Sequence, residues 1–157
     1  MKIEKFGFRF RADISFSRTA KVSGIDSDIQ DDDSGRHILL WDFDDTALPL
    51  IINELTTLQN RWALPDIRIM QSSLNSYHAL CFKALPYPLV LNILSSTKYL
   101  DLTYFKLGIV RGYFTLRYTS KDKKNKITLA RVLKSDVSAD NWAVPLLKIS
   151  DYTTEVH

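Results

Sequence analysis

The feature that most constrains the fold is an apolar run that ends abruptly in carboxylates. Residues 36–45 read RHILLWDFDD, and a continuous apolar run of this kind is typical of a strand that is covered on both faces. Side chains two apart on a strand share a face, so we expect Asp42 and Asp44 to project together while Phe43 enters the core. Burial of a carboxylate without a partner is costly. The pattern therefore indicates either a solvated strand end or a divalent-metal site.

Length and composition favour one globular domain spanning residues 1–157, because 157 residues with 45% apolar side chains can form a real core. No stretch approaches the roughly 18 consecutive apolar residues of a membrane span, and the N-terminus lacks a signal-type apolar segment. We therefore expect a cytoplasmic protein with no membrane partner. Cys81 lies in the apolar run HALCF, which predicts a buried small hydrophobe rather than a nucleophile.

Periodicity predicts an alternation of strands and helices. The surest helix is 48–62, where apolar residues recur at helical spacing. The acidic segment 24–35 has no apolar period and is predicted to be a mobile loop, whereas 113–134 reads as two strands joined by a polar turn, a hairpin with a basic tip. Further strands are expected in 6–16, 36–45, 63–73 and 76–82, and a second helix in 86–100. This order predicts an α+β domain with a mixed or antiparallel sheet and helices on one side.

Charge is distributed unevenly along the chain. Residues 1–60 carry seven Lys/Arg and eleven Asp/Glu, whereas residues 61–157 carry fourteen and seven. Between Lys106 and Lys134, nine basic residues face only Asp122. This density predicts an anion-binding surface, with a nucleic acid or nucleotide as the natural anion, although a solvated charge run is the alternative. The nucleic-acid-binding residues expected here are Arg111, Lys123, Lys124 and Lys126.

Further polar residues accompany the acidic pair. His78 follows a polar turn at the start of an apolar strand, and Ser76 lies two residues earlier on the same face. Asp101 follows the second helix, and Arg117 and Lys121 lie on the basic strand and at its polar end. Three carboxylates, a histidine and a cationic strand suit nucleotidyl transfer, in which metals hold a triphosphate and cationic groups stabilise phosphate charge.

In this order, the segments LLWDFD, SSLNSYHALCF, YLD and TLRYTSK resemble the archaeo-eukaryotic primase superfamily, which includes small primase-polymerases of plasmids and viruses; the resemblance covers residues 37 to about 121. It implies an RRM-like catalytic core and a DNA primase or polymerase acting on a single-stranded DNA or RNA template in replication or repair. A helicase or other replication protein would be a candidate partner.

The resemblance also implies roles for individual residues. Asp42, Asp44 and Asp101 would hold catalytic Mg²⁺ or Mn²⁺. His78 together with Ser76 would contact the incoming nucleoside triphosphate, and Arg117 and Lys121 would bind phosphate or template. No glycine immediately precedes Tyr77 and His78, where many relatives have one.

Two alternatives remain open. The segment DFDDT also fits the Asp-x-Asp-x-Thr pattern of haloacid-dehalogenase-type phosphatases, in which Asp42 would be the nucleophile and Asp44 the acid/base. Such enzymes need a downstream Gly-Asp, which this chain lacks, and a parallel sheet. The second alternative is a noncatalytic nucleic-acid-binding relative, whose acidic cluster would be only a solvated strand end.

Overall fold

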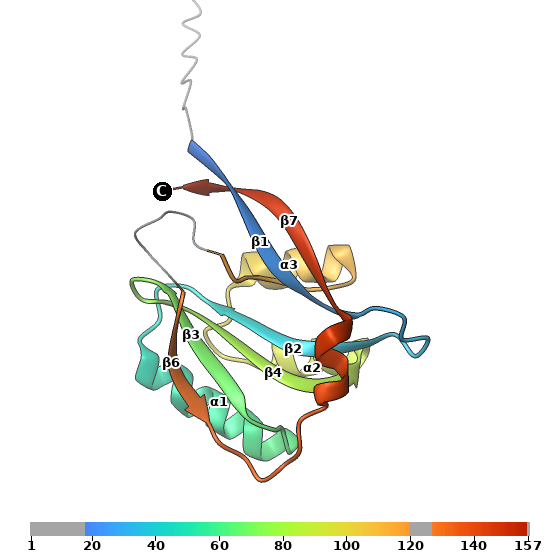
Figure 1. Ribbon diagram of the computed structural model, residues 1–157. Helices are drawn as coiled ribbons and strands as arrows, with labels where there is room; N and C mark the ends of the chain where they lie inside the picture. The colour runs from blue at the N-terminus through green and yellow to red at the C-terminus, as the bar shows by residue number, and fades with distance from the viewer. Residues whose placement is uncertain (1–17, 120–126, 157) are drawn as a thin grey trace, which may run out of the picture.

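The structure, a computed structural model, describes residues 18–119 and 127–156. These residues form one antiparallel sheet with helices packed against it (Figure 1). In chain order the elements are β1 (Arg18–Ile29), β2 (Arg36–Phe43), α1 (Leu48–Trp62), β3 (Ile67–Ser73), β4 (Ser76–Pro86), α2 (Tyr87–Ser95), α3 (Leu102–Arg111), β5 (Thr115–Arg117), β6 (Thr128–Leu133), the 3₁₀ helix η1 (Asn141–Leu146) and β7 (Leu147–Val156).

The strands follow the order β5-β1-β2-β4-β3-β6, with β7 also paired to β1. The long strand β1 joins two parts of this sheet. Most of its length pairs with β5 and β7, and its C-terminal end meets β2 at the register pair Asp28 and His37. Every described strand pair is antiparallel. This geometry disfavours the haloacid-dehalogenase alternative, which requires a parallel sheet.

The two faces of the central strands differ in what covers them. Helices α1 and α2 lie against one face, behind the sheet in Figure 1. Alternate residues of β2, β3 and β4 enter the core beneath these helices, among them Trp41, Ile69 and Cys81, each 0% exposed. The intervening side chains point to the opposite face, as strand alternation requires. The prediction that Cys81 is buried is confirmed, and burial raises the pKa of its thiol to about 12.

Several sequence predictions are confirmed. The helix expected at 48–62 is α1, with Pro49 in its first turn and Ala63 ending it in the left-handed conformation. The strands expected in 36–45, 63–73 and 76–82 are β2, β3 and β4, and the helix expected in 86–100 is α2. The α+β class, an antiparallel sheet and flanking helices are therefore established. The strand expected at 6–16 lies outside the described residues.

The prediction of a mobile loop at 24–35 is wrong for its first half. Residues 24–29 belong to β1, and only the residues after Ile29 form the turn to β2. The acidic pattern is misleading because Asp26 is fully buried and accepts hydrogen bonds from the hydroxyls of Thr115 on β5 and Ser150 on β7. These partners lie 89 and 124 residues away along the chain, so local composition could not reveal them.

The hairpin predicted at 113–134 is also wrong. Its two strands lie at opposite sides of the sheet, because β5 pairs with β1 and β6 pairs with β3. In addition, α3 was not predicted; it begins after its cap Asp101 and ends before Gly112, which adopts φ 80°. None of the described helices is long and apolar enough to cross a membrane.

A buried histidine lies where β1 meets β2, and we expect it to make the stability of the protein depend on pH. His37 is buried there, and its Nδ1 lies 3.0 Å from Ser27 Oγ. Burial lowers the pKa of His37 below its ordinary value of 6.5, and the charge of Asp28 opposes this only in part. As the pH falls below about 6.5, the unfolded chain binds a proton that the folded chain excludes, so the free energy of unfolding should decrease.

Denaturant titrations between about pH 7.5 and 5.5 would measure this decrease, whose slope cannot exceed about 1.4 kcal/mol per pH unit for one group. His37→Gln keeps a side chain that can accept the Ser27 hydrogen bond but does not titrate. The variant should therefore show a flatter pH profile than the wild type, and equal slopes for the two proteins would contradict the assignment to His37.

Candidate active site

The centre of the candidate site is the pair Asp42 and His78. These residues face each other across β2 and β4 as register partners, and His78 Nε2 lies 3.5 Å from Asp42 Oδ1. Both side chains belong to the face of the sheet opposite α1 and α2, since their neighbours Trp41, Phe43 and Ala79 enter the helix-covered core. The Asp42 side chain is 26% exposed and that of His78 is 5% exposed. The carboxylate therefore reaches solvent, whereas the imidazole is almost fully buried.

Asp101 is held next to this pair by the main chain. The N–H of Asp101 donates to the carbonyl oxygen of Asp42 over 2.9 Å. A second hydrogen bond also joins α3 to β2: the Tyr104 hydroxyl donates to the carbonyl of Leu40 over 3.0 Å. Since β1 pairs with β2 only near His37, the residues that begin α3 bond to the edge of β2 farther along the strand. The start of α3 is thus fixed beside the end of β2.

The Asp101 carboxylate also caps α3. Its Oδ1 accepts a hydrogen bond from the N–H of Tyr104, one of the donors that the first turn of a helix leaves without an intrahelical partner. A carboxylate has about four lone-pair positions, so a single capping bond leaves acceptor capacity on this group. Asp101 can therefore serve both the helix and a cation.

The other two residues of the predicted site lie near its edge. Asp44 is exposed and comes just after β2, which ends at Phe43. The strand alternation that would place it beside Asp42 is not continued beyond that point. Ser76 is the first residue of β4 and lies two residues before His78, on the same face of that strand.

The cationic residues are more dispersed than the sequence suggests. Arg117 lies on β5, and its Nη1 donates to the carbonyl of Thr119 over 2.8 Å. Arg111 is the exposed last residue of α3. Since β1 separates β5 from β2 in the sheet, Arg117 is two strands away from Asp42. The remaining predicted contacts, Lys121, Lys123, Lys124 and Lys126, lie outside the described residues.

No cluster of three or more His, Cys, Asp or Glu side chains arranged to hold a metal ion is found in residues 18–119 and 127–156. The donor chemistry nevertheless suits Mg²⁺ or Mn²⁺, which prefer oxygen ligands. Magnesium in phosphoryl-transfer sites is commonly held by one or two carboxylates together with substrate phosphates and waters. Asp42 and Asp101 could supply such a partial set.

Sequence reasoning did not identify two residues on the same face as Asp42 and His78. Arg68 on β3 and Phe82 on β4 both alternate with core residues, and the Arg68 guanidinium lies 5.4 Å from the centre of the Phe82 ring. The alternation of apolar and polar residues in IRI was the available signal for Arg68, whereas Phe82 lies in the apolar run HALCF, which gave no such signal. Comparison of the chain with protein-family models, with curated proteins and with solved structures finds no match in any of the three.

Proposed function

We propose that this protein is a divalent-metal-dependent nucleotidyltransferase of the primase-polymerase type, which extends or initiates a strand on a single-stranded nucleic-acid template. The observation that carries the proposal is that Asp42 and His78 are register partners and that the backbone of Asp101 is bonded to Asp42 at the same end of β2. The three residues come from segments that are well separated in the sequence. Their meeting agrees with the order of motifs on which the resemblance to the archaeo-eukaryotic primases rests.

Each group has a role that its position supports. Asp42 and Asp101, with Asp44 at the edge, would provide carboxylate oxygens for Mg²⁺ or Mn²⁺. When bound, the metal would neutralise phosphate charge and activate the attacking hydroxyl. His78 lies beside Asp42 as its register partner on the neighbouring strand. It would orient that carboxylate and donate to a phosphate oxygen, with the Ser76 hydroxyl next along the strand.

The antiparallel sheet supports this function over the phosphatase alternative, because the RRM-like core expected of primase-polymerases also has an antiparallel or mixed sheet with helices on one side. The same observations are compatible with a noncatalytic nucleic-acid-binding relative. A direct assay separates these possibilities, because binding alone yields no product.

The assay follows nucleotide incorporation on single-stranded templates, with and without a primer, using Mg²⁺ or Mn²⁺ and either ribo- or deoxynucleotides. We expect metal-dependent products that the Asp42→Ala/Asp44→Ala double variant does not make. Product lengths would then separate priming from extension. A phosphomonoester assay run in parallel tests the phosphatase alternative, and phosphate release that requires Asp42, with no polymer formed, would refute the proposal. Absence of both activities would leave a binding protein.

A further inference from the structure

The face of the sheet opposite α1 and α2, on which η1 also packs, carries a second set of side chains besides Asp42 and His78. Two rows run across the strands on this face. One row joins Asp42, His78 and Met70, and the next joins Leu40, Leu80 and Arg68 as register partners on β2, β4 and β3. The members of the second row lie two residues along each strand from those of the first. The candidate active site therefore adjoins a row in which Leu40 and Leu80 are buried and Arg68 is exposed.

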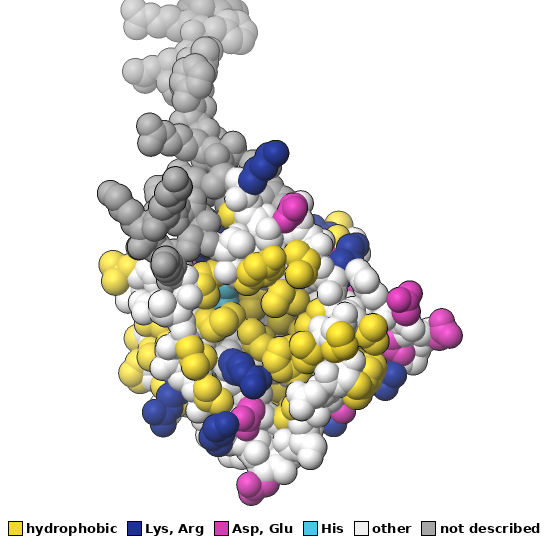
Figure 2. Space-filling view, in the orientation of Figure 1, with side chains coloured by type: hydrophobic (Ala, Val, Ile, Leu, Met, Phe, Trp, Pro, Cys, Tyr) yellow, Lys and Arg dark blue, Asp and Glu magenta, His cyan; other side chains and the backbone are white. Residues whose placement is uncertain are grey.

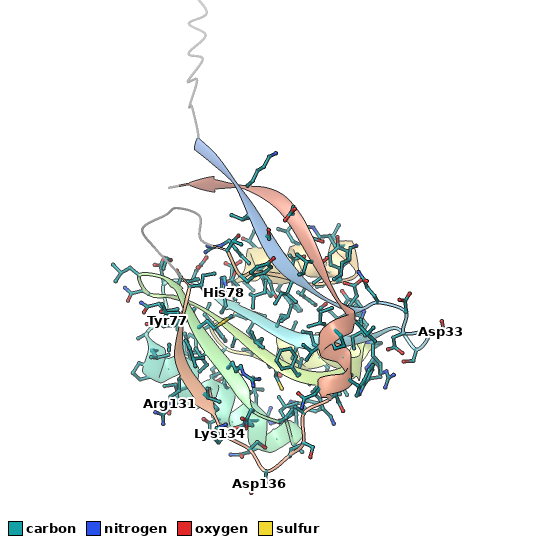
Figure 3. All side chains as sticks on the ribbon, viewed as in Figure 1. Asp33, Tyr77, His78, Arg131, Lys134 and Asp136 are labelled. Carbon is teal, nitrogen blue, oxygen red and sulfur yellow. The ribbon has the colours of Figure 1, made fainter. Side chains whose placement is uncertain are left out.

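Figure 2 shows this face in the orientation of Figure 1, with apolar side chains gathered around a hollow in its centre. The histidine visible at the edge of the hollow occupies the position labelled His78 in Figure 3. Met70 and Phe82 pack against Leu40 and Leu80 in the apolar cluster of this face. Both remain partly exposed, whereas Leu40 is only 1% exposed.

Arg68 gives this apolar surface a positive charge. Its side chain is exposed and its guanidinium lies 5.4 Å from the centre of the Phe82 ring. Within the described part of the chain Arg68 forms no ion pair; Asp66, whose pKa its charge helps to lower, is paired with Lys134 at 2.8 Å. Figure 3 shows Lys134 on the β6 side of the sheet, away from His78. The charge of Arg68 is thus available to an anion above the hollow.

We propose that Phe82 and Arg68 form a stacking platform for a base of the single-stranded template, with the guanidinium contacting the adjoining phosphate. The identity of the ligand rests on the proposed function. An aromatic ring stacks on any base, and a guanidinium adds cation–π and phosphate contacts, the combination by which proteins hold single strands regardless of sequence. Phe82 lies four residues beyond His78, or about 13 Å along β4 at the usual rise. The platform therefore lies within reach of a short template segment that starts at the candidate reaction centre.

Binding of a fluorescent single-stranded oligonucleotide, followed by anisotropy in chelator without nucleotide, tests the platform independently of catalysis. Phe82→Ala should weaken binding about 5- to 150-fold, the effect of losing one stacked base. Phe82→Tyr should restore binding, whereas Phe82→Leu, which keeps an apolar side chain without a ring, should not. Arg68→Ala should weaken binding and lower the dependence of log affinity on log salt by about 0.7, as expected for one lost phosphate contact.

Arg61→Ala is the matched charge control, because Arg61 is an exposed arginine in the last turn of α1, on the other side of the sheet. It should bind like the wild type, and thermal unfolding would verify that all variants fold. Equal affinity of Phe82→Leu and wild type, or an unchanged salt slope in Arg68→Ala, would overturn the platform. An effect confined to mononucleotide binding would also overturn it.

Different experimental results would contradict the platform and the nucleotidyltransferase function. If the wild type makes polymer but the Phe82 and Arg68 variants bind template normally, the platform is wrong and the nucleotidyltransferase function stands. If the variants lose template binding as expected but the wild type makes no polymer, the platform stands on a protein that only binds nucleic acid.

Discussion

Asp42→Asn should reduce metal-dependent nucleotide incorporation by at least about 100-fold, the usual effect of removing one electrostatic stabiliser of a transition state. The amide has nearly the same shape as the carboxylate but carries no charge, so it cannot hold a divalent cation in the same way. Its carbonyl oxygen can still face His78 Nε2, which lies 3.5 Å from the carboxylate in the wild type. The free energy of unfolding should therefore change much less than the activity.

Asp45→Asn is the matched control for this substitution. Asp45 is an exposed carboxylate three residues away, and it adopts φ 47°, a left-handed conformation that Asn also tolerates. We expect normal activity from this variant. Titration with Mn²⁺ provides a readout besides activity, since Asp42→Asn should weaken manganese binding and Asp45→Asn should not. Equal loss of activity in the two variants would show that the site depends on general negative charge rather than on Asp42.

Gly108→Ala should destabilise the protein by about 1–3 kcal/mol, although alanine is the better helix former. Gly108 is the buried residue of α3, and a Cβ at this position would overlap the ring of Phe114. That ring cannot easily move, because it is 1% exposed and lies against the rings of Tyr87, Tyr104 and Phe105. Thermal unfolding would detect the change as a decrease of roughly 2–4 °C per kcal/mol for a chain of this size.

Two further variants isolate the cause. Thr103→Ala places the same side chain at an exposed position of the same helix, where it should be neutral or slightly stabilising. Phe114→Leu removes the ring that the added methyl group of Gly108→Ala would meet. The double variant should therefore be more stable than the sum of the two single effects by about 0.5–3 kcal/mol. Strict additivity of the two substitutions would show that the overlap is relieved elsewhere.

Local sequence patterns were sufficient to predict the helices and strands whose residues pack against a continuous apolar core. Helix α1 was predicted with its observed limits, because apolar residues at helical spacing mark its buried face and Pro49 marks its start. Strand β2 was evident because its central residues are apolar and buried on both faces of the sheet. In such segments the pattern directly reflects the environment.

Elements stabilised by distant partners could not be predicted in this way. β1 has a polar sequence, yet Asp26 is buried because hydroxyls from β5 and β7 satisfy its carboxylate. Similarly, β5 and β6 looked like consecutive strands of a hairpin, but each pairs with a strand far away in the sequence. The identity of a strand's partner depends on the whole fold, and two neighbouring strand-like segments alone do not specify it.

The candidate site was predicted in part. The sequence order placed Asp42, His78 and Asp101 in one set, and the structure brings the first two into register and the third into backbone contact. The sequence did not indicate that Asp101 caps a helix, because α3 itself was not recognised. Arg68 and Phe82 were overlooked because each reads as an ordinary strand residue until the pairing of β3 with β4 brings them diagonally across from each other.

Where β1 no longer pairs with β2, the end of β2 is held by bonds to its main chain and not by the side chains that would carry out the chemistry. Beyond His37 the edge of β2 bonds to the start of α3, and the acceptors are the carbonyls of Leu40 and Asp42. Carbonyl groups are common to all residues, so these bonds do not depend on which side chain occupies position 42. The frame can therefore stay assembled while that side chain changes, which allows the reactivity of this corner to be altered by substitution without rebuilding the scaffold.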